Sequence, residues 1–527
     1  MAIFASISSR ATGKTPPRGA LGWFGPVVAA ASIGMLVMAP WLRPELFPAA
    51  WLGVAAGLVM ATGRRGWQSE LTIVAASLVA IGGAFHWTPE ALARCMRAEH
   101  WVGLAFAAPI VLWDAVRLAL PFWCVGRCVR DPRAAWLPAA LVAVVAEAIV
   151  PAVFPWKLGA VQASWPLLVQ SVDVLGAEGA TFVLFAHAGA MVVLATPLLG
   201  LASRRMPAAG MLALVVCALN LAYGAAALSR HALREGAAPQ LSVALVQVNP
   251  ERHDAIDDLR RLTRDVCSRA SAPELVCWPE CSGGSYEDGL AAFADVDTVF
   301  QRSRPPQRGL RPLPDPACQL LLGGKIYRGY PERPRQIFQS ALLVDENERL
   351  VGRYHKRYLM PFGEYVPGTD LFPDLRLYFP MENEFSIGAD ATVFECGAAR
   401  VGVMLCYEDM VPAAAASLAS AGANLFVSLI NGSAFTNPAT LTQHRLLAQL
   451  RAVENRRCLV RCAATGETCV IGPTGAVIDR LPLFVEDVLV AQVPLLEGRT
   501  AASLAAGWFP VACGLGLAAW LIRRRSA

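Results

Sequence analysis

Residues 401–409 read Val-Gly-Val-Met-Leu-Cys-Tyr-Glu-Asp, an apolar run that ends in a thiol and two carboxylates. A short apolar run with polar residues after it is typical of a buried β-strand. The pattern predicts a strand over Arg400–Leu405, with Cys406 at its carboxyl end. Because active sites in sheet folds lie beyond the carboxyl ends of strands, Cys406 is a candidate nucleophile.

Similar apolar runs on either side of this stretch predict a layered α/β domain rather than an isolated strand. Gly472–Gly475 signals a hairpin between two β-like runs, and helices are expected around 410–420 and 440–455. No G-x-G-x-x-G or G-x-x-x-x-G-K-[ST] fingerprint is present, which argues against nucleotide binding. The further predicted strands are Leu241–Val248, Glu274–Trp278, Gln319–Ile326, Gln339–Val344 and Asn424–Leu429.

Two further polar residues follow apolar runs in the same way. Glu280 closes the sequence LVCWPE, and Lys356 lies in YHKRYLMPFGEYVP. A thiol becomes a nucleophile when a base removes its proton, which Glu280 is suited to do. Lys356 is suited to stabilise the oxyanion that forms when a thiolate attacks a carbonyl. Each residue also has a structural explanation, as a core cysteine, a turn glutamate or a surface lysine, so the residues alone support only the broad class of cysteine hydrolases.

The amino-acid composition predicts a membrane part in addition to this domain. Of the 527 residues, 55% are hydrophobic and 17% are charged, whereas soluble domains have about 25% charged residues. A net charge of +5 is small, and the arginines flank apolar segments, so nucleic acid is a poor partner. About eight stretches are long enough to span a bilayer, near 21–43, 46–63, 71–87, 101–123, 135–154, 180–202, 208–229 and 504–522.

The basic residues predict which way these spans point. They gather in alternate loops, whereas the opposite loops hold few, and cytoplasmic loops are the basic ones. Both termini are therefore expected in the cytoplasm. The predicted parts are an N-terminal bundle of about seven helices (1–229), an extracytoplasmic catalytic domain (230–503), and a C-terminal helix with a basic tail (504–527). The loop residues that carry this prediction are Arg10, Lys14, Arg18, Arg64, Arg65, Arg127, Arg130, Arg133, Arg204, Arg205, Arg523, Arg524 and Arg525.

Ionisable residues inside the spans are few. Asp114 and Arg117 are three residues apart, which predicts an ion pair on one helical face, whereas Glu147 has no evident partner. The loop Phe154–Lys157 (FPWK) is interpreted as an interfacial anchor with its aromatic rings at headgroup depth. Fourteen cysteines do not form a zinc-binding pattern, and disulfides are expected among those of an extracytoplasmic domain, although the sequence does not pair them.

The sequence around each of the three candidate residues resembles that of a known family. Trp278-Pro279-Glu280, Lys356 followed by Pro361–Pro367 (PFGEYVP), and Cys406–Asp409 (CYED) are similar to motifs of the carbon–nitrogen hydrolase (nitrilase) superfamily, and more narrowly of its membrane branch, the apolipoprotein N-acyltransferases. The resemblance extends to FPW at 154–156, Gln443-His444, Arg451–Glu454 and Ile471–Pro473. It implies an αββα sandwich attached to the membrane bundle.

The resemblance also implies a site and a reaction. Glu280, Lys356 and Cys406 would act as base, oxyanion stabiliser and nucleophile, supported by Glu364, Tyr407, Glu408 and Phe435. A fatty acyl group would pass from a membrane phospholipid to Cys406 as a thioester, and then to the α-amine of a diacylglyceryl-cysteine lipoprotein. This chemistry needs no cofactor or metal. The implied location is the bacterial inner membrane, with a periplasmic catalytic domain and a monomeric protein.

Three departures from the family's pattern keep alternatives open. No tryptophan follows Gln247-Val248-Asn249, the loop Asn431–Phe435 (NGSAF) lacks the usual aspartate and tryptophan, and no arginine follows Glu147. A paralogue that acylates a different amine or hydrolyses an amide would keep the same three residues. A non-catalytic membrane sensor or transporter would instead have a broken triad and several buried charges in its spans.

Overall fold

The computed structural model describes two compact units, formed by residues 21–89, 104–226 and 507–526, and by residues 90–103 and 227–506. Within these ranges it leaves undescribed residues 64–65, 97, 199–204, 249–254, 281, 283–284, 288–317, 329–335, 347–348, 379–383, 434 and 436. The basic residues Arg10, Lys14, Arg18, Arg64, Arg65 and Arg204 therefore lie outside the described residues, as does Asn249.

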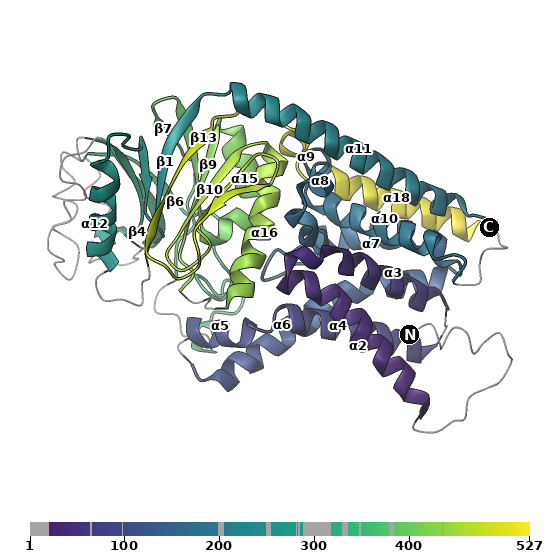
Figure 1. Ribbon diagram of the computed structural model, residues 1–527. Coiled ribbons are helices and arrows are strands. Elements are labelled where there is room, and N and C mark those ends of the chain that lie inside the picture. Colours follow the sequence, from purple (N-terminus) through teal and green to yellow (C-terminus); the bar gives the residue numbers. More distant parts are fainter. Residues whose placement is uncertain are drawn as a thin grey trace. The chain divides into compact units, whose positions relative to one another are not determined.

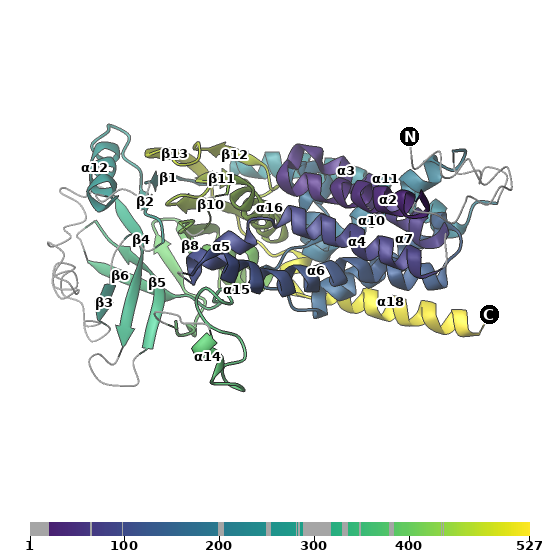
Figure 2. The ribbon, with the colours of Figure 1, turned by 90° about the horizontal axis from the view of Figure 1, so that it is seen from below.

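The first unit is a bundle of helices (Figures 1 and 2). Within the part of the chain that the structure describes, six helices are long and apolar enough to cross a membrane, or seven if α4 and the following α5 (Thr88–Cys95) form one broken span. The last helix also has 18 residues, but arginines occupy its final three positions, so the predicted count of eight spans stays a prediction. The long helices are α2 (Leu21–Leu42), α3 (Phe47–Gly63), α4 (Trp67–Ala84), α6 (His100–Cys128), α7 (Pro132–Ile149), α10 (Ala177–Leu194), α11 (Ala208–Ala237) and α18 (Trp508–Arg525).

Three short helical segments that the sequence did not predict connect α7 to α10. They are η2 (Leu158–Ser164), α8 (Pro166–Val169) and α9 (Val172–Leu175). Glu147 holds the first of them, because its carboxylate accepts hydrogen bonds from the Leu158 N–H and the Thr181 hydroxyl, both at 2.8 Å. Glu147 therefore has partners. The sequence did not predict them because they lie 11 and 34 residues away in the chain.

The interpretation of residues 154–157 as an interfacial anchor is wrong for Trp156. This side chain is only 2% exposed and meets Trp41 edge-on, with ring centroids 6.2 Å apart. The guanidinium carbon of Arg117 lies 4.0 Å from the centroid of the Trp156 ring, a cation–π contact that favours the buried position. Arg117 also pairs with Asp114 at 3.4 Å, so the predicted ion pair is confirmed.

The second unit contains two β-sheets. In the first, the strand order is β13-β1-β2-β4-β5-β6, and β3 also pairs with β4; in the second it is β12-β11-β10-β9-β8-β7. All six predicted strands are present, with ends that differ by up to three residues, and the hairpin at Gly472–Gly475 joins β11 to β12. The strands are β1 (Gln240–Gln247), β2 (Leu275–Cys277), β3 (Ser285–Glu287), β4 (Gln319–Arg328), β5 (Gln336–Val344), β6 (Leu350–His355), β7 (Val393–Cys396), β8 (Ala399–Leu405), β9 (Leu425–Ile430), β10 (Cys458–Ala463), β11 (Cys469–Ile471), β12 (Val477–Arg480) and β13 (Asp487–Pro494).

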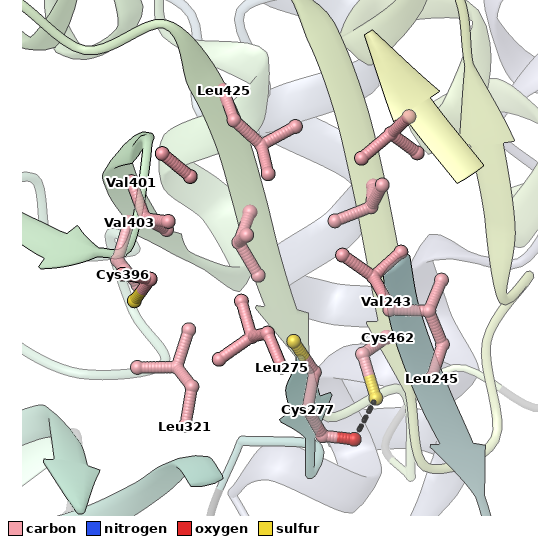
Figure 3. Packing of buried hydrophobic residues seen from close by; sticks show 14 of the residues in the cluster. Val243, Leu245, Leu275, Cys277, Leu321, Cys396, Val401, Val403, Leu425 and Cys462 are labelled. Atoms are coloured by element: carbon pink, nitrogen blue, oxygen red, sulfur yellow. Dashed lines mark hydrogen bonds between the residues drawn. The ribbon is translucent and has the colours of Figure 1, made fainter. Parts of the chain in front are cut away.

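The two sheets face each other across one apolar core, in which Val243, Leu275, Val403 and Leu425 lie (Figure 3). The outer face of the first sheet packs against α12 (Ala255–Cys267). The outer face of the second packs against α15 (Pro412–Ser420) and α16 (Pro438–Asn455). Because both faces of each sheet are covered, the strands are continuous apolar runs, and the layers form an αββα sandwich.

Strand direction determines where the polar strand ends meet. β8, β9 and β10 run parallel, and Leu405 of β8 pairs with Leu429 of β9. β1, β2 and β4 are likewise parallel, with Cys277 opposite Leu321. The residues that follow these strands are therefore collected at the carboxyl ends of the parallel strands, where active sites of sheet folds form.

Candidate active site

Cys406 stands at the sharp change from β8 to the 3-10 helix η4 (Cys406–Met410). Its φ of +48° lies in the left-handed region, which residues with a Cβ adopt only when their surroundings enforce it. Cys406 is partly exposed, and its thiol donates a hydrogen bond to the Asn431 carbonyl, with sulfur and oxygen 3.9 Å apart. The turn thus presents the thiol at the end of the strand, as expected for a nucleophile.

Lys356 lies between two carboxylates. Its Nζ donates to Oε1 of Glu280 at 3.2 Å and to Oε1 of Glu364 at 2.7 Å, and the lysine is 1% exposed. An ammonium group has three N–H bonds, and these two contacts use two of them. The second oxygen of Glu280 accepts from the Asn431 N–H at 3.2 Å. Asn431 therefore contacts both the candidate base and the candidate nucleophile.

A tight turn in the PFGEYVP sequence positions Glu364. Phe362 has a φ of +61°, and its N–H donates to the Tyr365 carbonyl at 2.8 Å. Oε2 of Glu364 accepts from the Met360 N–H at 2.7 Å, which directs Oε1 toward Lys356. The turn explains why this sequence follows the lysine so closely: it brings a second carboxylate to the same ammonium group.

Glu408 joins the turn of Cys406 to the loop of Lys356. It is fully buried, and one oxygen accepts from the Tyr354 hydroxyl at 2.7 Å and from the N–H groups of Arg357 at 2.7 Å and Tyr358 at 3.0 Å. The other oxygen accepts from the Leu405 N–H at 2.8 Å. Glu408 thus fixes the register between the two segments. Tyr407 beside it is 7% exposed, and burial raises the pKa of its phenol.

Burial and charge act on the three central groups in different directions. Burial raises the pKa of the Cys406 thiol, Glu280 raises it further, and Lys356 opposes both. Burial also raises the pKa of Glu280 despite the nearby Lys356. Burial alone would lower the pKa of Lys356, but Glu280 and Glu364 outweigh it and raise this pKa well above its usual value. The amine is therefore held as a cation, and the carboxylate is made more basic than in water.

The structure brings Glu280, Lys356 and Glu364 into direct contact, and the charges of all three act on Cys406. Phe435 lies in a turn of its own, where its N–H donates to the Gly432 carbonyl at 2.7 Å. Sequence reasoning missed Gln339, whose side chain hydrogen-bonds to Glu280, and the backbone of Asn431. The sequence signal for Gln339 is a polar residue within a mostly apolar strand. The backbone N–H of Asn431 gives no sequence signal.

Among the residues that the structure describes, no group of three or more His, Cys, Asp or Glu side chains could hold a metal ion. Glu280 and Lys356 are both charged and both buried, with 6% and 1% of their surface exposed. A partly exposed thiol together with a buried carboxylate and a buried ammonium group are the components of covalent acyl transfer or hydrolysis.

Comparison with known proteins first defines the class of this site. Residues 242–502 match the carbon-nitrogen hydrolase family, and this range contains all of the candidate site residues. An amidase from Nesterenkonia sp. of known structure is 23% identical, with 48% of this chain and 90% of the amidase covered and a TM-score of 0.35. The match over residues 242–502 assigns this unit to the carbon–nitrogen hydrolases.

The membrane part defines the family more narrowly. Residues 33–190 match the apolipoprotein N-acyltransferase N-terminal domain. An apolipoprotein N-acyltransferase of Geobacter metallireducens is 29% identical over 515 residues, 94% of each chain. Another, from Azotobacter vinelandii, is 30% identical over 331 residues, 61% of each chain. The chain belongs to the apolipoprotein N-acyltransferase family, the membrane branch of the carbon–nitrogen hydrolases.

Proposed function

We propose that this protein is a phospholipid-dependent apolipoprotein N-acyltransferase with Cys406 as its nucleophile. The observation that carries the proposal is the contact of Lys356 with Glu280, 3.2 Å apart in the domain that contains Cys406. The family match over both the membrane part and the catalytic part supports lipid substrates rather than soluble ones.

In the first half-reaction, Glu280 takes the proton of the Cys406 thiol. The thiolate attacks an ester carbonyl of a phospholipid, and the third N–H of Lys356 stabilises the oxyanion. The carbon–oxygen bond of the ester then breaks, and the departing lysophospholipid oxygen takes the proton back from Glu280. A thioester between Cys406 and the fatty acyl group remains.

In the second half-reaction, the α-amine of a diacylglyceryl-cysteine lipoprotein attacks this thioester. Glu280 accepts a proton from the amine, the carbon–sulfur bond breaks, and the thiolate of Cys406 takes up that proton. The amine is thereby converted to an amide, and the enzyme returns to its starting state. Because each lipid substrate enters in turn, one site serves both.

The proposal includes eight membrane spans, cytoplasmic termini, a periplasmic catalytic domain and a monomeric enzyme of the inner membrane. The described part of the basic pattern that supports this orientation includes Arg127 in the last turn of α6, Arg130 in the following loop and Arg133 in the first turn of α7. A disulfide between Cys267 and Cys318 also supports it, since disulfides persist in the periplasm and are rare in the cytoplasm.

The decisive test of function uses purified protein with phosphatidylethanolamine and a synthetic diacylated lipopeptide. The expected product is the lipopeptide with one additional amide-linked acyl chain, detected by mass spectrometry, and Cys406→Ala should form none. A paralogue of the same family remains the second candidate because the loop at 431–435 reads NGSAF. Acylation of other amines, or hydrolysis of an amide, with no acylation of the lipopeptide would favour that paralogue and overturn the proposal.

A further inference from the structure

Asp409 has no role in the steps proposed above, yet it lies three residues after Cys406 in the same 3-10 turn. Asp409 is close enough to Cys406 for the charge of its carboxylate to act on the thiol. Asp409 is completely buried. A buried carboxylate is costly unless it is fully paired, so its partners indicate what it does.

The partners of Asp409 come from three neighbouring elements. Oδ1 accepts from Nε2 of His444 on α16 at 2.5 Å. Oδ2 accepts from the Ser428 hydroxyl on β9 at 2.8 Å and from Nε of Arg461 on β10 at 3.0 Å. The Arg461 side chain is 2% exposed and that of His444 is 13% exposed. The turn that carries Cys406 is therefore tied to two strands and one helix through a single carboxylate.

The charge of Asp409 works against the nucleophile unless it is cancelled. Burial raises the pKa of Cys406, and the carboxylates of Glu280, Glu364 and Asp409 raise it further, while Lys356 alone lowers it among these charged groups. Each unpaired negative charge near the thiol thus disfavours the thiolate.

Arg461 provides the cancelling charge, and His444 adds a hydrogen bond to the same carboxylate. Burial by itself would raise the pKa of Asp409, but these two partners outweigh it and hold the pKa well below its usual range. Arg461 in turn faces Asp409, Cys469 and Glu467, and Glu467 is paired with Arg445 at 2.7 Å.

We infer that Asp409 is a positioning residue for Cys406, held by His444 and Arg461 so that its buried carboxylate fixes the nucleophile turn without opposing thiolate formation. The inference rests on the proposed function only in taking Cys406 as the nucleophile. It assigns Arg461, which is far from Cys406 in the sequence, an electrostatic part in the reactivity of the thiol.

The test is the rate at which iodoacetamide alkylates Cys406 in the full-length protein, followed on the Cys406 peptide by mass spectrometry so that other cysteines do not interfere. Arg461→Gln keeps an N–H donor for Asp409 but removes the positive charge. We expect about tenfold slower alkylation at a fixed pH of about 8, equivalent to a rise of about one unit in the pKa of the thiol. The double variant Asp409→Asn with Arg461→Gln removes both charges and should return to within about twofold of the wild type.

Arg480→Gln is the matched control. Arg480 pairs with Glu467 at 2.9 Å and has no described contact with Asp409, so its loss should leave the alkylation rate unchanged. An unchanged rate in Arg461→Gln, or a slow rate that persists in the double variant, would overturn the inference. If Arg461→Gln does not fold, Asp409→Asn alone decides: it should accelerate alkylation, and an unchanged or slower rate contradicts the inference. Because alkylation needs no lipid, a lack of acyl transfer would overturn the proposed function without affecting this result.

Discussion

Nζ of Lys356 lies 3.2 Å from Oε1 of Glu280, although 76 residues separate the two in the chain. The contact forms because Glu280 follows β2 and Lys356 follows β6, two strands of one sheet. A second carboxylate, Glu364, lies 2.7 Å from the same amine. The ammonium group of Lys356 thus contacts two carboxylates. One of them, Glu280, is the proposed base for Cys406.

Replacing Glu280 by Gln should remove the proposed base while preserving its size and its contact with Lys356. The amide oxygen still accepts from Lys356, whereas the NH2 group cannot accept from the Asn431 N–H as the second carboxylate oxygen does. We expect acyl-enzyme formation to slow by about 10²–10⁴-fold, the usual contribution of a positioned base. Single-turnover measurement of acylation with phosphatidylethanolamine checks this, and circular dichroism verifies the fold. A rate within a factor of about three of the wild type would be incompatible with a base at this position.

Glu364→Gln should change the pH dependence of acylation. Burial raises the pKa of Glu280, Lys356 lowers it, and the negative charge of Glu364 raises it. Glu280 must be ionised to act as a base, so the rate falls as the pH drops through this raised pKa. Removal of the Glu364 charge lowers the pKa of Glu280, and the acidic limb of the pH–rate profile should move by roughly 0.5–1 unit to lower pH. A limb that stays in place, or moves to higher pH, would show that Glu364 does not act on the base.

Glu147 should stabilise the membrane unit through its two hydrogen bonds rather than through its charge. Glu147→Gln retains an oxygen for the Leu158 N–H, and its amide can donate to the Thr181 hydroxyl. Glu147→Ala leaves both groups without that partner, at a cost of about 1–3 kcal/mol. Thermal unfolding in detergent should therefore show a clearly lower midpoint for Ala than for Gln. Equal midpoints for the two variants would exclude a hydrogen-bonding role.

The disulfide of Cys267 with Cys318 tests the proposed orientation. A catalytic domain in the periplasm should contain this bond in cells, whereas a cytoplasmic one should keep both thiols reduced. Peptide mapping without reduction, on protein trapped with an alkylating agent at lysis, should find the two peptides linked. Cys318→Ser is the control that abolishes the linked pair. Two fully alkylated thiols in the wild type would contradict the periplasmic placement.

Much of the catalytic unit could be predicted from the sequence because its strands are buried on both faces. Runs such as LSVALVQV at 241–248 are then almost entirely apolar, and Glu280, Lys356 and Cys406 stand out as the polar residues that follow them. The direction of the chain at strand ends brings Glu280 and Lys356 together, so their contact could be anticipated from the pattern of the sequence.

The remaining contacts depend on tertiary packing that no local pattern records. Trp156 resembles a residue of the membrane surface, but Arg117, 39 residues away, gives its ring a buried partner. In the sequence Asp409 is only the last residue of the CYED motif. Its three hydrogen-bond partners come from β9, β10 and α16, which are distant in the chain. A backbone N–H such as that of Asn431 is present in almost every residue, so the sequence does not single it out. It contacts Glu280 because the segment after β9 lies beside the end of β2.

The central claim is that Cys406 becomes acylated by a phospholipid. Intact-mass measurement of the purified protein after incubation with phosphatidylethanolamine tests it most directly, with Cys406→Ala as the comparison. We predict a mass increase of one fatty acyl group on the wild type, lost on treatment with hydroxylamine as a thioester should be, and no increase on the variant. Folded wild-type protein that gains no acyl group from any phospholipid, or a variant that gains the same adduct, would contradict the account.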